Sequence, residues 1–512
     1  MSAGQPSSLP RRAGAANTQR ALFLLASLPI AAFITFGILV AFGYQTDRYG
    51  MIAMALLTIS IALVPIILDQ ARPAERRHIL LTFYCLLFII HFGLPIFTQY
   101  ASVSMPTDPP GVVGVALFPK DIIVGQVIAL IGLVSLYLGY VLTPSRMSDR
   151  DIARRQARDW SPELIPIIAM MMLVLGWTVV ISGALGLIPR AIGSGVISTI
   201  GSSVFFGNAL LTVAAVRHRS RIALLMLFIA VPISSGLGFF TGSKQSTLMV
   251  PFIVFFTTML LGGRLRARWM LAGVLGLAML YPVAQFYRQD VLDSNRLTIV
   301  DALSDPNRTF GQISDFLSSS RAGVYFGDGL TATAARLDAI GIESVIVRDT
   351  PSVSPFQEGR TIGLFFTAFV PRLLWSGKPD ITLGQWITDT YGSGSHIKSH
   401  TGPSFIGDLY LNFGVASVVV GMILIGVFLR LFQTRFLGPN PTTVGILAAI
   451  VVVAQFHIKQ IGAAAHVLSS TVFALAPVLI VYLAVGLLAR RGSGRPTPNW
   501  SEQDNSGTDV RF

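Results

Sequence analysis

The chain has 512 residues, of which 52% are hydrophobic and only 12% are charged. A soluble globular protein carries roughly 25% charged residues, so this composition excludes a soluble fold and predicts an all-α polytopic integral membrane protein. The net charge of +13 comes mainly from arginines beside apolar segments, where anionic headgroups attract them, and we therefore expect the lipid bilayer and no nucleic acid as a partner.

Runs of about 20 apolar residues, the length that crosses a bilayer as a helix, occur along most of the chain. They predict about twelve transmembrane helices, nine within 21–287 and three within 409–489. The first apolar run is too long for a signal peptide, so it is expected to remain as an anchor. The expected spans lie near 21–43, 50–68, 79–99, 122–143, 164–187, 198–216, 222–240, 246–262, 269–287, 409–430, 442–459 and 466–489.

Arginines divide the connecting segments into two alternating sets. One set includes both chain ends, 1–20 and 490–512, and holds 23 arginines and no lysine. Because positive charges are retained on the cytoplasmic side, both termini are expected in the cytoplasm. The C-terminal tail 490–512 has the composition of a disordered segment.

The long connection 288–408 is the one large segment on the expected outer face. Within it, 361–375 is mostly apolar but too short to span a bilayer, which predicts a re-entrant or interfacial helix. Pro371 would kink or end that helix, and 376–380 has the composition of a turn. We therefore expect a partly helical extracytoplasmic loop that packs on the outer ends of the spans.

All the lysines of the chain lie in the outer set of connections. This distribution opposes the positive-inside trend and favours an anionic substrate on the outer face. For Arg372 two interpretations stay open: it reaches the headgroup region as an anchor beside Trp375, or it binds phosphate together with Lys378. The five lysines are Lys120, Lys244, Lys378, Lys398 and Lys459.

Asp408, within the sequence 402-GPSFIGDLYLNFG-414, lies at the mouth of an expected span. An ionisable residue there requires a partner or a function, so it either caps or pairs locally, or takes part in chemistry. The pair of histidines in 396-HIKSH-400 has helical spacing but lacks the glutamate of a zinc-protease motif. With a single cysteine, Cys85, the sequence predicts neither a metal site nor another cofactor.

The run 359-GRTIGLFFTAFVPRLLWSGKP-379, followed by the stretch that contains Asp408, resembles the Wzy-type O-antigen polymerases. The resemblance covers the last two fifths of the chain and departs at Asp408, where the family often has glutamate. It implies a metal-independent glycosyltransferase of the bacterial inner membrane. Its substrates would be oligosaccharide repeat units on undecaprenyl diphosphate, and its partners a chain-length regulator and a flippase.

The resemblance also implies roles for individual residues. Asp408 or His400 would be the general base for the acceptor hydroxyl. Cations would neutralise the departing diphosphate, namely Arg372, Lys378, Arg360 and Arg288, with Lys244 and Arg336 as further candidates. Aromatic side chains would stack on sugar faces, namely Trp375, Trp386 and Tyr410.

Two other functions stay open at this stage. An O-antigen ligase would use the same lipid-linked donor with a different acceptor. A transporter or flippase would require charged residues in the middle of the spans, and the expected spans contain almost none.

Overall fold

The computed structural model of the chain describes most of the apolar segments and much of the long connection. The described residues are 46–72, 77–100, 111–112, 115–144, 159–188, 199–241, 244–263, 283–284, 286–287, 305–319, 323, 327, 335, 337–370, 374–375, 377–392, 402–438 and 440–492. The expected first span 21–43 and most of the ninth, 269–287, lie outside these ranges, as do both chain ends.

Helices dominate the described residues. The helices of the first half are α2 (Thr46–Ala71), α3 (Ile79–Phe88) with the π-helical turns η2 (Ile89–Gly93) and η3 (Ile96–Tyr100), α4 (Pro119–Leu142), α6 (Leu164–Ala184), α8 (Ser203–Val216), α9 (Arg221–Phe240) and α10 (Lys244–Leu260). Those of the second half are α13 (Pro306–Ser318), α15 (Ala339–Asp349), α16 (Arg360–Thr367), α17 (Gly384–Tyr391), α18 (Phe405–Phe413), α19 (Val415–Phe436), α20 (Thr443–Val451), the π-helical η5 (Val452–His457) and α21 (Ala464–Gly492).

Eight helices among the described residues are long and apolar enough to cross a membrane, and the chain is a multi-pass helical membrane protein. Two shorter apolar helices, Gln245–Leu260 and Thr443–His457, coincide with further expected spans. The total of twelve spans and the placement of the termini stay predictions. The short strands β1 (Gly111–Val112) and β2 (Val115–Ala116) form an antiparallel pair, in which Val112 pairs with Val115.

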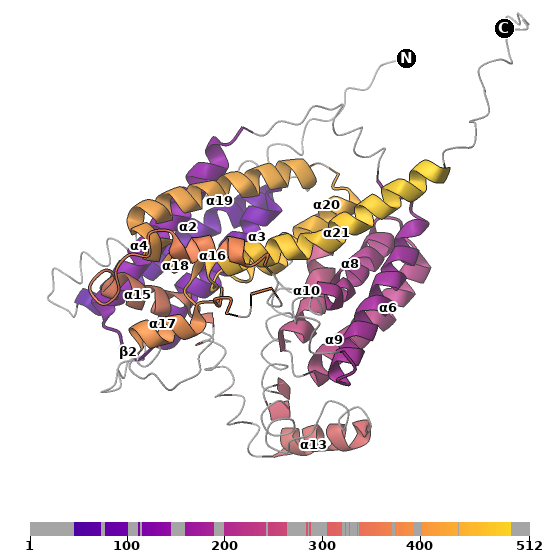
Figure 1. Cartoon of the computed structure of the whole chain (residues 1–512), viewed down its shortest axis with the longest axis horizontal. Coiled ribbons are helices and arrows are strands. Elements are labelled where there is room, and N and C mark those ends of the chain that lie inside the picture. Colours follow the sequence, from indigo (N-terminus) through magenta and orange to yellow (C-terminus); the bar gives the residue numbers. More distant parts are fainter. Residues whose placement is uncertain are drawn as a thin grey trace, which may run out of the picture.

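The helices form two neighbouring groups (Figure 1). In one group α4 packs against α2, α15 and α19, and in the other α6, α8, α9 and α10 pack on one another. Helix α20 contacts members of both groups, since it touches α8 and α10 as well as α19. The helices of the long connection, α15 to α18, lie beside the first group.

Glycines on one face of α4 allow its neighbours to approach closely. Gly125, Gly132 and Gly139 recur every seven residues. A Cβ at Gly139 would lie 2.1 Å from the carbonyl oxygen of Ile423, and one at Gly426 would lie 2.1 Å from that of Leu136. Helices α4 and α19 are therefore in backbone contact, the packing that small residues permit where the hydrophobic effect is weak.

The long connection is fastened to the spans by hydrogen bonds at the start of α15. Tyr100 donates its hydroxyl to a carboxylate oxygen of Asp338 over 2.5 Å. The other oxygen of Asp338 accepts from the backbone N–H of Gly341 and so caps α15. At the other end of α15, Arg348 donates to the carbonyl of Ala116. Helix α15 is therefore held across the first helix group.

Two elements differ from the sequence expectation. The helix expected at 361–375 is Arg360–Thr367, and the Lys378 ammonium donates to the carbonyls of Ala368 and Val370 just beyond its end. The span expected to begin at residue 409 begins at Val415 instead. Gly414, with φ of +66°, separates it from α18, because a left-handed backbone cannot continue a helix.

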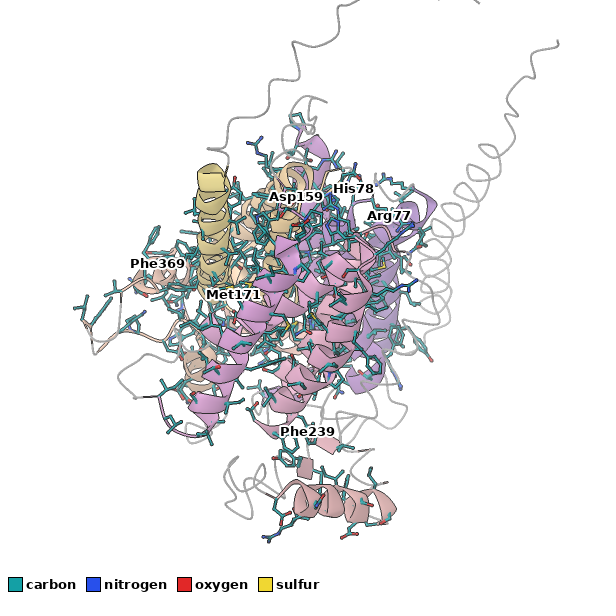
Figure 2. All side chains as sticks on the ribbon, turned by 90° about the vertical axis from the view of Figure 1, so that its right-hand side faces the viewer. Arg77, His78, Asp159, Met171, Phe239 and Phe369 are labelled. Carbon is teal, nitrogen blue, oxygen red and sulfur yellow. The ribbon has the colours of Figure 1, made fainter. Side chains whose placement is uncertain are left out.

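Connections rich in arginine meet at one end of the helix groups. Arg430 lies 3.0 Å from Nδ1 of His78, and Arg77 donates to the carbonyl of Gly263 over 2.6 Å. Figure 2 shows Arg77, His78 and Asp159 near this end and Phe239 near the opposite one. The described parts of these arginine-rich connections therefore lie at the same end of the helix groups. We call this the arginine end.

Candidate functional site

A cavity of about 340 Å³ lies between α16 and α17, within the long connection that the arginine count is expected to place on the outer face. Arg360 begins α16 and is exposed, and Trp386 lies on α17 with its ring edge-on to Tyr391. The walls are formed by Gln357, Arg360, Thr361, Leu364, Pro379, Asp380, Leu383, Gln385 and Trp386. We call this the outer cavity.

Backbone hydrogen bonds position the two helices that form the outer cavity. The N–H of Gln357 donates to the carbonyl of Leu411 over 2.8 Å, so the segment before α16 satisfies the C-terminal end of α18. Gly359, with φ of +87°, then turns the chain into α16. Before α17, the carboxylate of Asp380 accepts from the backbone N–H and the hydroxyl of Thr382.

Asp408 lies directly behind the wall of the outer cavity and is completely buried. The Thr361 hydroxyl donates to Oδ1 of Asp408 over 2.6 Å, and the backbone N–H of Ala464 donates to Oδ2 over 2.7 Å. Thr361 lines the cavity, whereas Asp408 does not. Thr361 therefore links the lining of the cavity to this carboxylate.

Asn412 completes this polar group. Its amide donates to the Thr361 hydroxyl oxygen over 2.6 Å and to the backbone carbonyl of Asp408 over 2.7 Å. Burial raises the pKa of Asp408 to about 6, although the hydrogen bonds from Thr361 and Ala464 oppose that shift. At pH 7 the ionised carboxylate then predominates. Asp408 is thus a base whose pKa lies close to neutral pH.

Glu343 is a second fully buried carboxyl group, on the other side of the first turn of α18. Ser404, the N-cap of α18, donates its hydroxyl to Oε2 of Glu343 and accepts from the N–H of Gly407, each over 2.8 Å. Burial raises the pKa of Glu343 to about 8, so at pH 7 it is mostly protonated. No Lys or Arg in the described part of the chain forms an ion pair with Glu343 or Asp408.

The other predicted site residues divide into two groups. Lys378, Trp375 and Tyr410 are described but do not line the outer cavity. Lys378 donates to the carbonyl of Ala368 at the C-terminal end of α16. Trp375 is 42% exposed, and Tyr410 packs against Phe356. Arg288, Arg336, Arg372 and His400 lie outside the described residues, and so does the side chain of Lys244.

Sequence reasoning did not single out three polar residues near Asp408, whereas it named Lys459 only as one of five lysines. Thr361 and Asn412 are common residue types without a motif, and only their contacts reveal them. The position of Glu343 could have indicated a special role, because an acidic residue inside an apolar run is unusual. Lys459, half-buried with a pKa that burial lowers, forms no ion pair within the described ranges and lies in electrostatic range of His466.

The described residues contain no group of three or more His, Cys, Asp or Glu side chains that could hold a metal ion. Neither a curated protein nor a solved structure matches this chain. One family model does match, over residues 126–436, which include Arg360, Thr361, Trp386 and Asp408. The chain therefore belongs to the family described as Domain of unknown function (DUF8712).

Proposed function

We propose that the chain is a membrane glycosyltransferase that polymerises oligosaccharide repeat units carried on undecaprenyl diphosphate, at the outer face of the bacterial inner membrane. The observation that carries this proposal is the convergence of three residues on the outer cavity. Arg360 and Trp386 line it, and Asp408 reaches it through Thr361. Transfer of a sugar from a diphosphate requires a base for the acceptor hydroxyl and a cation for the leaving group, and an aromatic ring offers a sugar a flat apolar face.

In this reaction the acceptor sugar hydroxyl hydrogen-bonds to the Thr361 oxygen in the outer cavity. As that hydroxyl attacks the anomeric carbon of the donor, its proton passes to Thr361, whose own proton moves to Oδ1 of Asp408. The bond between the anomeric carbon and the diphosphate oxygen breaks, and the diphosphate leaves with the electron pair. The carboxylate is ionised at pH 7 and already accepts from Thr361, so it is ready to act as the base.

Cations neutralise the charge that develops on the departing diphosphate. Arg360 is exposed on the cavity wall, and its planar guanidinium can bind two phosphate oxygens at once. Arg372, Lys378, Arg288, Lys244 and Arg336 stay proposed phosphate ligands, and His400 stays an alternative base. Trp386 offers a flat apolar face to a sugar ring, and Trp375 and Tyr410 stay proposed for the same task.

The surface next to the outer cavity suits a lipid-linked substrate. Phe366 and Leu374 are 73% and 78% exposed, and Phe369 packs against Phe473 on the spanning helix α21. Exposed aromatic and aliphatic side chains beside a spanning helix are suited to contact with lipid. A polyprenyl tail could therefore stay in the bilayer while its diphosphate enters the cavity.

A ligase would use the same donor, base and cations, so the acceptor has to be identified by experiment. Deleting the gene in the native host and analysing its glycolipids separates the two functions. A polymerase predicts that single repeat units on the carrier accumulate. Full-length polymer on the carrier together with an uncapped acceptor would instead identify a ligase, and an unchanged outer-leaflet glycolipid pool would contradict both.

A transporter is disfavoured by the described spans. Their Asp, Glu, Lys and Arg residues lie in the first or last third of each span, for example Asp69, Asp121 and Arg430. Carrying a charged substrate through the membrane requires such groups near the midplane. The buried carboxyl groups of Asp408 and Glu343 lie in α18 and α15, outside the eight spans.

A further inference from the structure

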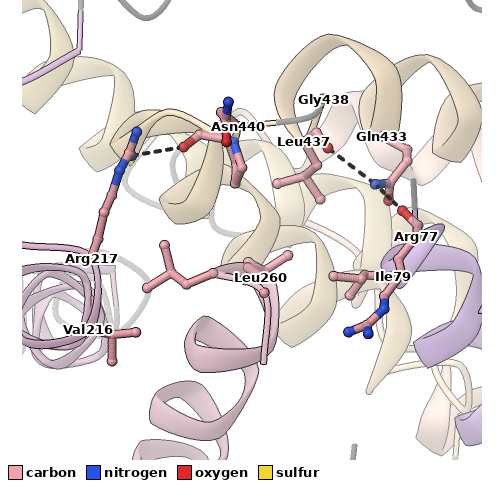
Figure 3. A pocket seen from close by; sticks show the side chains of 12 residues that line it. Arg77, Ile79, Val216, Arg217, Leu260, Gln433, Leu437, Gly438 and Asn440 are labelled. Carbon is pink, nitrogen blue, oxygen red and sulfur yellow. Dashed lines mark hydrogen bonds between the residues drawn. The ribbon is translucent and has the colours of Figure 1, made fainter. Parts of the chain in front are cut away.

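A second cavity, of about 310 Å³, lies at the arginine end, between the start of α3 and the ends of α8, α10 and α19 (Figure 3). Arg77 and Arg217 line it from opposite sides and donate to the backbone carbonyls of Gly263 and Pro441. These two arginines therefore hold connections together. Beside the outer cavity, by contrast, Asn412 bonds to a hydroxyl that the proposed reaction uses.

Asn412 joins α18 to the start of α16. It is completely buried and lies four residues after Asp408 on the same helix. Its Nδ2 donates to Oγ1 of Thr361 over 2.6 Å and to the backbone carbonyl of Asp408 over 2.7 Å. The backbone carbonyl of Asn412 accepts from the N–H of Glu358 over 3.2 Å. Both the side chain and the backbone of Asn412 therefore fix the position of Thr361 relative to Asp408.

The direction of each hydrogen bond follows from the chemistry of the partners. A carbonyl oxygen can only accept, so the Asn412 atom that faces the carbonyl of Asp408 is the amide nitrogen. The same nitrogen faces Thr361, whose oxygen is thus an acceptor. An ionised carboxylate also only accepts, so the Thr361 hydrogen points to Oδ1 of Asp408. A hydroxyl oxygen has two lone pairs, and one therefore remains on Thr361.

We propose that Asn412 is a positioning residue of the transfer reaction, which reserves the remaining lone pair of Thr361 for the acceptor hydroxyl. This inference rests on the proposed function. The amide donates both before and after transfer, so the Thr361 hydrogen has two directions left, toward Asp408 and toward the outer cavity. The acceptor proton becomes the new hydroxyl hydrogen of Thr361, and the former one ends on Oδ1 of Asp408. The sugar oxygen keeps the electron pair and forms the bond to the anomeric carbon.

Asn412 also stabilises the negative charge that the Thr361 oxygen carries while the two protons move. Removing one fixed N–H donor from a developing oxyanion typically lowers kcat by roughly 10²- to 10³-fold. Asn412 does not line the outer cavity, so it has no contact with a substrate bound there. Its loss is therefore expected to lower kcat and to leave KM unchanged.

Asn208 is a matched control on α8, in the other helix group. It is completely buried, and its Nδ2 donates to the carbonyl of Val204, also four residues earlier, and to the hydroxyl of Ser234. Ser234 accepts from Nε1 of Trp177 as well, and within the described ranges it bonds to no carboxylate. Replacing Asn208 removes the same kinds of hydrogen bond as replacing Asn412 without touching a base.

The charged and titratable side chains on the elements packed against α18 do not contact Asp408 within the described ranges. They include Arg360 on α16, Glu343 on α15, Asp121 on α4 and His466 on α21. Hydrogen bonds from Thr361 and Ala464 oppose the effect of burial on the pKa of Asp408. A change in the bond from Thr361 should therefore be visible in the titration of Asp408.

The first measurement follows the infrared band of the protonated Asp408 carboxyl group in the purified full-length protein, identified by its absence from Asp408→Asn. The wild type is expected to titrate near pH 6. Asn412→Leu is expected to titrate about one pH unit higher, because a Thr361 hydroxyl that accepts no hydrogen bond is a weaker donor to the carboxylate. Asn208→Leu should titrate like the wild type.

A second variant keeps the test valid if leucine prevents folding. The hydroxyl of Asn412→Ser can bond to the carbonyl four residues earlier but is too short to reach Thr361, so only the bond in question is lost. The same upward shift is expected. Wild-type titration of Asp408 in both Asn412 variants would overturn the proposal, and so would an equal shift in Asn208→Leu.

Initial rates with a purified lipid-linked repeat unit complete the test. Both Asn412 variants are expected to lower kcat about 100-fold at unchanged KM, with a pH profile that moves upward together with the Asp408 titration. A normal kcat and pH profile would refute the positioning role even if Thr361→Val is inactive. A wild type that transfers no sugar, although the Asp408 titrations differ as expected, would instead refute the proposed function and leave the hydrogen-bonded connection between Asn412 and Asp408 intact.

Discussion

Charge is used differently at the arginine end and beside the outer cavity. At the arginine end, the buried Arg77 and the partly exposed Arg217 donate to backbone carbonyls, and Arg217 forms an ion pair with Asp159. Beside the outer cavity, Asp408 and Glu343 are completely buried and bond to hydroxyls and backbone N–H groups instead of cations. The arginines hold neighbouring connections together. Burying the two carboxyl groups costs desolvation energy, and no ion pair within the described residues offsets that cost.

The comparison teaches where function should be sought. Exposed ion pairs contribute little to stability and tolerate substitution. A fully buried carboxylate with a pKa near neutrality is a costly feature and marks a candidate site. The same conservative change from aspartate to asparagine should therefore have very different effects at the two ends.

The largest effect is expected for Asp408→Asn, which keeps the size of the side chain but removes the base. Loss of a general base typically lowers a rate by 10²- to 10⁴-fold, so the variant should yield only single repeat units. Polymer length on a gel, with the membrane level of the protein measured by blot, checks this. A full-length ladder at normal protein level would show that Asp408 has a structural role.

Glu343→Gln should change how stability depends on pH. The native pKa of about 8 lies above the value of 4.5 for the free side chain, so the folded state retains a proton that the unfolded state loses. Stability from this group is present below pH 4.5 and is lost as the pH rises toward 8. Between pH 6 and 8 the wild type should lose about 2 kcal/mol, and Glu343→Gln should lose much less.

The measurement is the thermal unfolding midpoint of both proteins across that pH range. Glu163→Gln, a substitution of an exposed glutamate before α6, is a matched control that should follow the wild type. Parallel pH profiles for the wild type and Glu343→Gln would mean that Glu343 is not protonated in the native state. That outcome would contradict the statement that the buried acids beside the outer cavity have raised pKa values.

Arg360→Ala should lower the rate of polymer formation about tenfold or more, since one of several phosphate donors is lost. Arg360→Lys should recover only part of the activity, because an ammonium group cannot bind two oxygens in one plane. Initial rates with a purified lipid-linked repeat unit measure this. Arg308→Ala, on the exposed helix α13, is the control, and an unaffected Arg360→Ala enzyme would exclude Arg360 from the site.

The smallest effect is expected for Asp159→Asn at the arginine end. Its ion pair with Arg217 is partly exposed, and such pairs are worth about 0.2 to 1 kcal/mol. The thermal midpoint should fall by no more than a few degrees, with polymer length unchanged. If this variant abolished polymer formation as Asp408→Asn is expected to do, the distinction between the two ends would fail.

Much of the helical framework could be predicted from the sequence, because apolar length alone defines a span. The segments expected at 79–99, 122–143 and 222–240 are the helices Ile79–Tyr100, Pro119–Leu142 and Arg221–Phe240. The break at Gly414 was missed because glycine is also common inside membrane helices, and only its positive φ reveals the interruption.

The candidate site was predictable only in part. Arg360, Trp386 and Asp408 have uncommon chemistry for their surroundings, so the sequence draws attention to them. Thr361 lines the cavity with Arg360 and Trp386 and donates a hydrogen bond to Asp408, 47 positions away. A threonine among apolar residues does not by itself predict such a bond. Long-range hydrogen bonds of this kind are decided by the packing of α16 on α18, which no local pattern encodes.

The most direct test of the account replaces Thr361, the hydroxyl between the outer cavity and Asp408. Thr361→Val has nearly the same shape but no hydroxyl, and Thr361→Ser restores it. Polymer length is compared in a deletion strain that produces each variant at equal membrane level. The account predicts single repeat units with valine and a ladder with serine. A normal ladder with Thr361→Val would contradict it, because Asp408 would then have no route to the cavity.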